Sequence, residues 1–119
     1  SAAKSNHASV VKYIAAELQK CNMDESTSMD GNLTCSAKST TGTVQAAAIL
    51  ALADFKNPYD TGNAAVSTSE TSIGYVNVTD DGSDVEVETC FAEIDDGAGG
   101  VACKSGDSTS TLSNTVAIE

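Results

Sequence analysis

The sequence predicts a single α+β domain in which an N-terminal amphipathic helix and a second short helix pack on a three- to four-stranded antiparallel sheet. Three observations support this class. Apolar residues recur every three or four positions within residues 1–22, which is the period of a helix lying on a core. A second run at 43–55 is rich in Ala and Leu and favours a helix. From residue 64 onward apolar residues alternate, as in strands with one buried face.

The first helix is expected over residues 1–22. Its apolar stripe, spaced by four and three residues, contains His7, Val11, Ile14, Leu18 and Cys21. We expect Val11, Ile14 and Leu18 to make the helix–sheet packing, and His7, the only histidine, to pack or fray without a catalytic role. The first turns hold a lysine and no acidic residue, and Ser1 has no Glu or Gln three positions later to complete a capping box. We therefore expect this segment to be the remainder of a longer helix that has been cut.

Residues 23–63 are predicted to be a variable segment that connects the helix to the sheet. Met23–Gly31 is turn-like. The second helix is predicted over Thr43–Phe55, with Thr43 as its cap, and is expected to be well buried because it is apolar nearly all round. Lys56–Gly62 is predicted to be a turn, since Asn-Pro and Asp-x-Gly both disfavour a continuing helix.

Residues 64–119 are predicted to form the sheet and a disulfide-bounded loop. The expected strands are Ala64–Ser67, Ser72–Val78, Val85–Phe91 and Leu112–Ile118. The register of the second strand is ambiguous, and Gly74 is expected to mark a bulge there. Asp80–Ser83 contains Asp-Gly and predicts a hairpin turn, whereas Asp95–Gly100 is expected to be a flexible loop.

The four cysteines, Cys21, Cys35, Cys90 and Cys103, favour two disulfides over a metal site, because no CxxC pair is present and one His is too few for a usual zinc set. Three connectivities are possible. We prefer sequential pairing, because each pair then encloses a loop of turn residues, and a short extended piece at Asn32–Ser36 would return Cys35 to the helix end. Disulfides indicate a location outside the cytoplasm.

The net charge of −11 and the absence of Arg argue against nucleic-acid binding and against anionic membranes. The charge is unevenly placed, with +2 in residues 1–22 and −13 in the remainder. Two interpretations remain open. The basic helix pairs with the acidic bodies of neighbouring copies, or the lysines simply lie on a solvated face.

The acidic residues Asp80, Asp81, Asp84, Asp95 and Asp96 are weak candidates for Ca²⁺ ligands. Neither cluster fits an EF-hand loop, and turn chemistry alone explains the Asp-Gly pairs. No cofactor is expected, because phosphate-loop, dinucleotide and nucleophile-elbow motifs are all absent, and an enzyme is the least expected class.

Two triplets, Asn32-Leu33-Thr34 and Asn77-Val78-Thr79, match the N-glycosylation sequon. Such triplets arise often by chance in a chain rich in Ser and Thr, and the second lies in a predicted strand, so we favour a chance match over glycosylation.

Taken in order, these parts resemble a type IV pilin without its N-terminal hydrophobic half-helix. The resemblance comes from the amphipathic helix at 1–22, the connecting segment, the hairpin-rich sheet at 64–118, and the loop between Cys90 and Cys103, which is similar to the disulfide-bounded region of that family. It implies a subunit of an extracellular filament used for attachment, surface motility or DNA uptake. It further implies self-assembly into a helical homopolymer through the missing half-helix, which would hold the subunit in the inner membrane before assembly.

Two alternatives remain. A pseudopilin of a type II secretion system is similar in helix and sheet, and a Ca²⁺-dependent melting shift would favour it. A secreted carbohydrate-binding module belongs to a different class, and the 4% aromatic content speaks against it.

Overall fold

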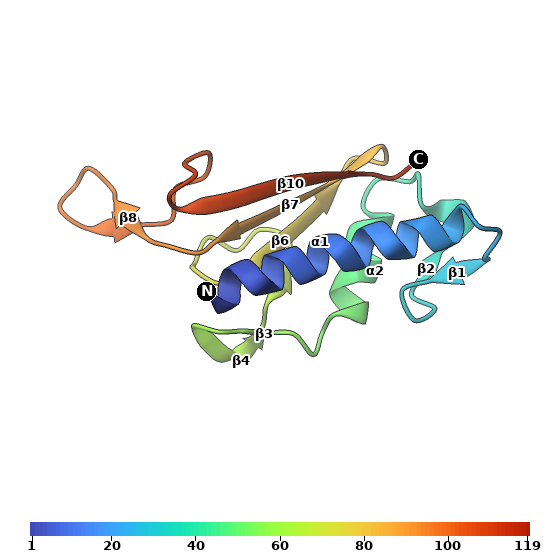
Figure 1. Ribbon diagram of the computed structural model, residues 1–119, viewed down its shortest axis with the longest axis horizontal. Coiled ribbons are helices and arrows are strands. Elements are labelled where there is room, and N and C mark those ends of the chain that lie inside the picture. Colours follow the sequence, from blue (N-terminus) through green and yellow to red (C-terminus); the bar gives the residue numbers. More distant parts are fainter.

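The computed structural model, which describes residues 1–119, places helix α1 (Ala2–Cys21) lengthwise along one face of a four-stranded sheet (Figure 1). The body is elongated, with extents of 52 × 27 × 19 Å. The Ser1 side chain accepts a hydrogen bond from the Lys4 N–H at 3.3 Å and so caps α1. As the sequence indicates, the first turn of α1 holds no acidic residue. Neither helix combines the length and the apolar character that crossing a membrane requires.

The buried stripe of α1 confirms the predicted packing of Ile14 and Leu18 but shifts its centre by one residue. Val10 is fully buried, whereas Val11 lies half-buried at the margin of the core. The stripe contains Ala3, His7, Val10, Ile14, Glu17 and Leu18. The rotation of about 100° per residue explains the shift, because position 10 continues the line from 3 and 7 through 14 better than position 11 does.

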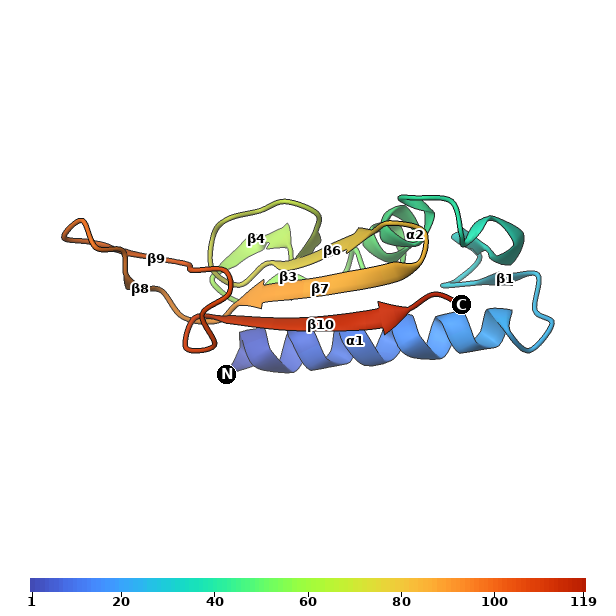
Figure 2. The ribbon, with the colours of Figure 1, turned by 90° about the horizontal axis from the view of Figure 1, so that it is seen from above.

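The main sheet has the strand order β10-β7-β6-β5. Figure 2 shows β10, β7 and β6 side by side. Its strands are β5 (Val66–Ser67), β6 (Val76–Asp80), β7 (Asp84–Cys90) and β10 (Thr111–Ala117). The β6–β7 hairpin and the final strand confirm the predicted elements. The prediction of an entirely antiparallel sheet is wrong at one edge, where β5 runs parallel to β6. Residues 68–75 connect these two strands without a helix.

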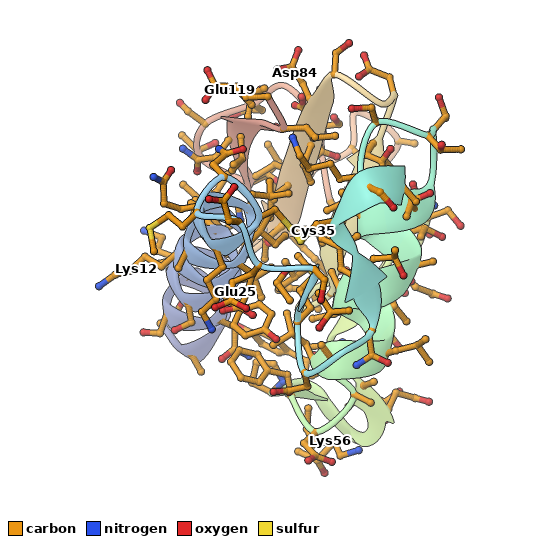
Figure 3. The ribbon with its side chains drawn as sticks, turned by 90° about the vertical axis from the view of Figure 1, so that its right-hand side faces the viewer. Lys12, Glu25, Cys35, Lys56, Asp84 and Glu119 are labelled. Atoms are coloured by element: carbon orange, nitrogen blue, oxygen red, sulfur yellow. A yellow bond between two sulfur atoms is a disulfide. The ribbon has the colours of Figure 1, made fainter.

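Helix α2 (Thr43–Ala51) covers the same sheet face as α1, beside β6 and β5. Figure 3 shows the two helices on either side of packed side chains. The helix is shorter than predicted, and Gly42, with φ of 86°, takes the N-cap position expected for Thr43. Burial is also incomplete, because only one side of α2 rests on the core and Leu50 remains 65% exposed.

Three small hairpins flank this core. They are β1 (Thr27–Ser28) with β2 (Leu33–Thr34), β3 (Lys56–Asn57) with β4 (Asp60–Ala64), and β8 (Ile94–Asp95) with β9 (Val101–Ala102). A short 3-10 turn over Cys35–Ala37 follows β2. The segments predicted as a turn at 56–62 and as a flexible loop at 95–100 thus belong to hairpins, since turn residues of this kind also close strand pairs.

Gly74 lies just before β6 and does not form a bulge within it. Its φ of 93° favours glycine, and an added Cβ would lie 2.0 Å from Asn57 Oδ1. The Asn57 side chain is fully buried there and donates from Nδ2 to the Ile73 carbonyl at 3.1 Å. Close approach of the 56–64 hairpin to the sheet therefore requires glycine at position 74.

Candidate functional site

The outer face of the sheet, away from both helices, is polar and acidic. On β7 the side chains of Val85, Val87 and Thr89 are buried beneath the sheet. The alternate positions carry Asp84, Glu86 and Glu88 on the opposite face. The strand therefore presents a row of three carboxylates at every second residue, in the middle of the sheet and not at its edge.

Hydroxyl groups of the neighbouring strand and loop surround these carboxylates. Glu86 accepts a hydrogen bond from Thr115 at 3.1 Å, and Glu88 accepts one from Ser105 at 2.8 Å. The Ser113 hydroxyl lies 3.4 Å from an oxygen of each glutamate. No lysine contributes to this network, because the only ion pair in the molecule joins Lys20 to Glu17 on α1. The carboxylates of the outer face thus accept hydrogen bonds from hydroxyl groups, and no lysine neutralises their negative charge.

A hollow of about 380 Å³ opens at the hairpin end of this face. It is lined by Thr79, Asp80, Asp81, Asp84, Glu86 and Thr115. No group of three or more His, Cys, Asp or Glu side chains is placed to hold a metal ion. Asp80, Asp81 and Asp84 therefore share the hollow without forming a set of metal ligands, and other roles account for four of the five Ca²⁺ candidates.

Asp80 is turned inward and binds the start of α2. Its carboxylate accepts from the Gly42 N–H at 2.7 Å and from the Gln45 N–H at 2.8 Å. In return, Gln45 Oε1 accepts from the Asp80 N–H at 3.1 Å. This pair of contacts resembles a capping box in which the capping carboxylate comes from another strand. Asp80 therefore substitutes for the side-chain cap that α2 lacks.

The remaining Ca²⁺ candidates bind their own turns, with the exception of Asp84, which is exposed. The N–H groups of Asp84 and Ser83 donate to the Asp81 carboxylate and lower the pKa of that carboxyl. Asp95 accepts from the Gly97 N–H at 2.9 Å. The N–H groups of Ala98 and Gly100 likewise lower the pKa of Asp96. These carboxylates stabilise hairpin turns, as turn chemistry predicts.

The second candidate surface is the arm at residues 91–104, which projects from one end of the long axis (Figure 1). The Cys90–Cys103 disulfide closes it, as preferred from the sequence. Its β8–β9 hairpin leaves Val101 61% exposed. The arm therefore offers a small apolar and backbone surface that stands clear of the body.

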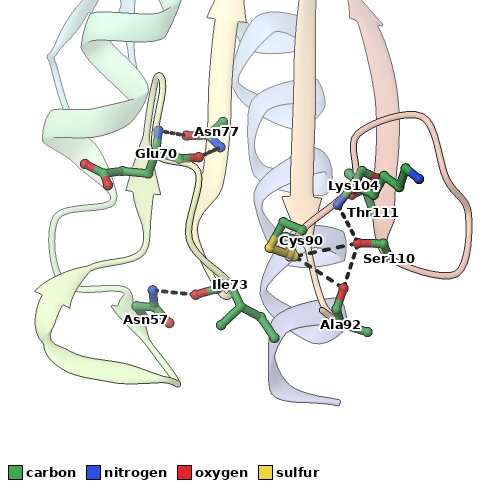
Figure 4. The surroundings of a disulfide bond; sticks show 10 residues. Asn57, Glu70, Ile73, Asn77, Cys90, Ala92, Lys104, Ser110 and Thr111 are labelled. Carbon is green, nitrogen blue, oxygen red and sulfur yellow. Dashed lines mark hydrogen bonds between the residues drawn. A yellow bond between two sulfur atoms is a disulfide. The ribbon is translucent and has the colours of Figure 1, made fainter. Parts of the chain in front are cut away.

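Ser110 holds the base of the arm. Its hydroxyl donates to the Ala92 carbonyl at 2.7 Å and accepts from the Lys104 N–H at 2.8 Å, so one buried side chain joins both ends (Figure 4). The Ser110 carbonyl also accepts from the Phe91 N–H. Sequence reasoning missed this residue, because one serine in a polar run carries no distinguishing signal.

The opposite end of the molecule is held by the Cys21–Cys35 disulfide, which is also confirmed, and by Glu17. Burial raises the pKa of Glu17, but the hydrogen bonds from Lys20 and from the Met29 N–H outweigh this effect, and the pKa is lowered. The Met29 N–H donates to the carboxylate at 2.6 Å. The sequence did carry a signal here, because an acidic residue falls on the buried line of α1.

His7 is buried at the other end of α1, where it binds two strands. Its Nδ1 lies 2.8 Å from the Thr89 hydroxyl and its Nε2 lies 2.7 Å from Asn114 Oδ1. An amide oxygen only accepts, so Nε2 carries a proton and donates to Asn114. His7 therefore joins α1 to β7 and β10, which agrees with a packing role.

No family model, curated protein or solved structure matches the chain.

Proposed function

We propose that this chain is a structural subunit of an extracellular filament of the type IV pilus kind, used for attachment, surface motility or DNA uptake. The observation that carries the proposal is one long helix lying lengthwise under a sheet whose other face stays open. The two disulfides support a location outside the cytoplasm. The proposed activity is assembly into a helical homopolymer and not catalysis.

The outer side of α1 suits contact with other copies. Its exposed residues are mostly small or uncharged and include Ala8, Ala15, Ala16 and Gln19. Such a surface lets neighbouring backbones approach closely, whereas the charged outer face of the sheet favours contact with water. In the proposed filament, the outer side of α1 lies against a neighbouring copy.

The two faces are also opposite in charge. Lys4 and Lys12 are exposed on α1, and Glu86 and Asp84 are exposed on the sheet. Contacts between copies that bring these faces together would be strengthened at low ionic strength. This arrangement supports the first of the two interpretations of the uneven charge.

The test is to delete the gene in its source cells and to label sheared surface filaments with antibodies against residues 1–119. We expect gold label along the whole filament, loss of filaments on deletion, and recovery on complementation. Filaments that persist without label in the deletion strain would overturn the proposal. If the deletion instead abolished protein secretion, the pseudopilin alternative would replace it, and specific binding on a glycan array would favour the carbohydrate-binding alternative.

A further inference from the structure

The two Asn-x-Thr triplets have different surroundings in the fold, and the Asn77 side chain is hydrogen-bonded at both ends of its amide. It lies on β6, which is paired on both sides. Its Oδ1 accepts from the Glu70 N–H at 2.9 Å, and its Nδ2 donates to the Glu70 carbonyl at 2.8 Å (Figure 4). Both ends of the amide hold the 68–75 loop against the sheet. Modification of Asn77 would break both bonds and disturb a central strand.

Asn32 is in the opposite situation. It is exposed and directly follows a left-handed turn made by Met29, Asp30 and Gly31, with φ of 53°, 56° and 82°. Its Nδ2 makes a single hydrogen bond, to the Met29 carbonyl at 2.9 Å, which occupies one of the two amide protons. The neighbouring strand pair has only two residues on each side.

The two side chains that N-glycosylation requires share one side of this segment. Asn32 and Thr34 are both exposed, whereas Leu33 between them is fully buried. This alternation is that of an extended strand. Leu33 therefore anchors the segment in the core. The Asn32 amide and the Thr34 hydroxyl, the two groups of the sequon that the transferase recognises, both face outward.

An exposed carboxylate precedes this acceptor by two positions, at Asp30. A cationic groove can hold such a group by a charge-assisted hydrogen bond, and this adds a third point of recognition on the same turn. The corresponding position before Asn77 is Tyr75, which offers no charge. Asp30 therefore favours the Asn32 triplet over the Asn77 triplet as the acceptor, as the exposure of Asn32 also does.

We propose that Asn32 is the acceptor for an N-linked glycan delivered from a lipid-linked diphosphate oligosaccharide. Nδ2 attacks the anomeric carbon, the bond from that carbon to the diphosphate oxygen breaks, and the lipid diphosphate leaves with the electron pair. One Nδ2 proton passes to a base of the transferase. The site lies inside the segment closed by Cys21 and Cys35, a bridge that forms in the oxidising compartments to which such lipids deliver glycans. The proposal does not depend on filament assembly.

The test is to export the chain in a bacterial host that carries an oligosaccharyltransferase and its lipid-linked oligosaccharide. Trypsin separates the two triplets, because cleavage after lysine places Asn32 in the peptide 21–38 and Asn77 in the peptide 57–104. After reduction, we expect one glycan mass on peptide 21–38 and none on 57–104. Asn32→Gln should abolish the addition, and the matched variant Asn77→Gln should leave occupancy at position 32 unchanged.

Asp30→Asn tests the third point of recognition and should reduce occupancy by about tenfold, the effect of one charge-assisted hydrogen bond. Intact mass after alkylation without reductant shows whether each variant retains both disulfides and is folded. Absence of glycan on the folded chain, in cells that modify a control acceptor, would overturn the proposal. Modification of Asn77 in place of Asn32 would overturn it equally.

Discussion

The side chains of Asp80 and Gln45 each accept a hydrogen bond from the backbone N–H group of the other residue, although the two lie 35 positions apart in the chain. The pair ties the first turn of α2 to the hairpin end of β6. It also places a carboxylate at a helix N-terminus, where the helix dipole favours negative charge. This relationship explains how α2 forms without a side-chain cap of its own.

Asp80→Ala should lower the free energy of unfolding by about 2 kcal/mol, because it leaves the Gly42 and Gln45 N–H groups without their acceptor. Urea denaturation followed by circular dichroism measures the change. Asp84→Ala is the matched control, since that carboxylate is exposed and accepts no hydrogen bond. Equal effects of the two substitutions would contradict the capping role of Asp80.

Ser110→Ala should cost about 2 kcal/mol, since it removes the hydroxyl that joins Ala92 to Lys104. The substitution should lower the stability of the arm itself as well as the free energy of unfolding of the whole chain. Hydrogen exchange at residues 91–104 should become faster than in the wild-type chain, whereas the exposed Ser108→Ala serves as a control and should change neither quantity. Unchanged exchange in Ser110→Ala would show that the disulfide alone holds the arm.

Removal of either disulfide should lower the free energy of unfolding by about 3 kcal/mol in the chain-entropy model, because the closed loops are similar in length. The pairs Cys21→Ser with Cys35→Ser and Cys90→Ser with Cys103→Ser isolate each bridge. Their effects should add, since the bridges lie at opposite ends of the molecule. Equal melting temperatures of the wild-type chain with and without reductant would contradict a stabilising role for both.

The stability of the fold should fall in acid in part because of Glu17. The folded-state pKa of this carboxyl is below its usual value of 4.5, so its contribution is present above that pH and is lost as the pH falls through the folded value. Glu17→Gln should therefore flatten the decrease in unfolding free energy below about pH 4.5. Glu25→Gln, at an exposed position on the same segment, should retain the wild-type slope.

Tyr13→Phe should leave the fold unchanged or stabilise it by about 1 kcal/mol. The Tyr13 hydroxyl is the one buried side-chain polar atom without a hydrogen-bond partner, and burial raises the pKa of this phenol. Tyr59→Phe is the control, because that ring is 53% exposed. A clear destabilisation by Tyr13→Phe alone, measured by urea denaturation, would reveal a partner for this hydroxyl.

The periodicity of the sequence is sufficient to predict α1 and the β6–β7 hairpin, because the helix and both strands have one buried face. The final strand β10 is also predicted, although only its first residue, Thr111, is buried. The sequence also contains an indication of the Asp80 contact, since an acidic residue continues the buried alternation of Val76 and Val78. The parallel pairing of β5 leaves no such mark, because a two-residue strand is too short to show a period.

The same limit applies to the candidate site. The acidic outer face follows from alternation along β7, and the disulfide pairing follows from the loops that it closes. The role of Ser110, in contrast, depends on residues 92 and 104 meeting in space, and local sequence does not encode that meeting. The buried contact of Asn57 with the backbone before Gly74 escapes prediction for the same reason.

The two disulfides also determine how the chain responds to pulling. Tension applied along the backbone passes across each sulfur–sulfur bond, so the residues inside the two loops bear no load and release no length. A single proteolytic cut between Cys21 and Cys35 or between Cys90 and Cys103 would likewise leave one covalently connected molecule. The hairpins at both ends can therefore vary in sequence or be nicked while the mechanical path from α1 to β10 stays continuous.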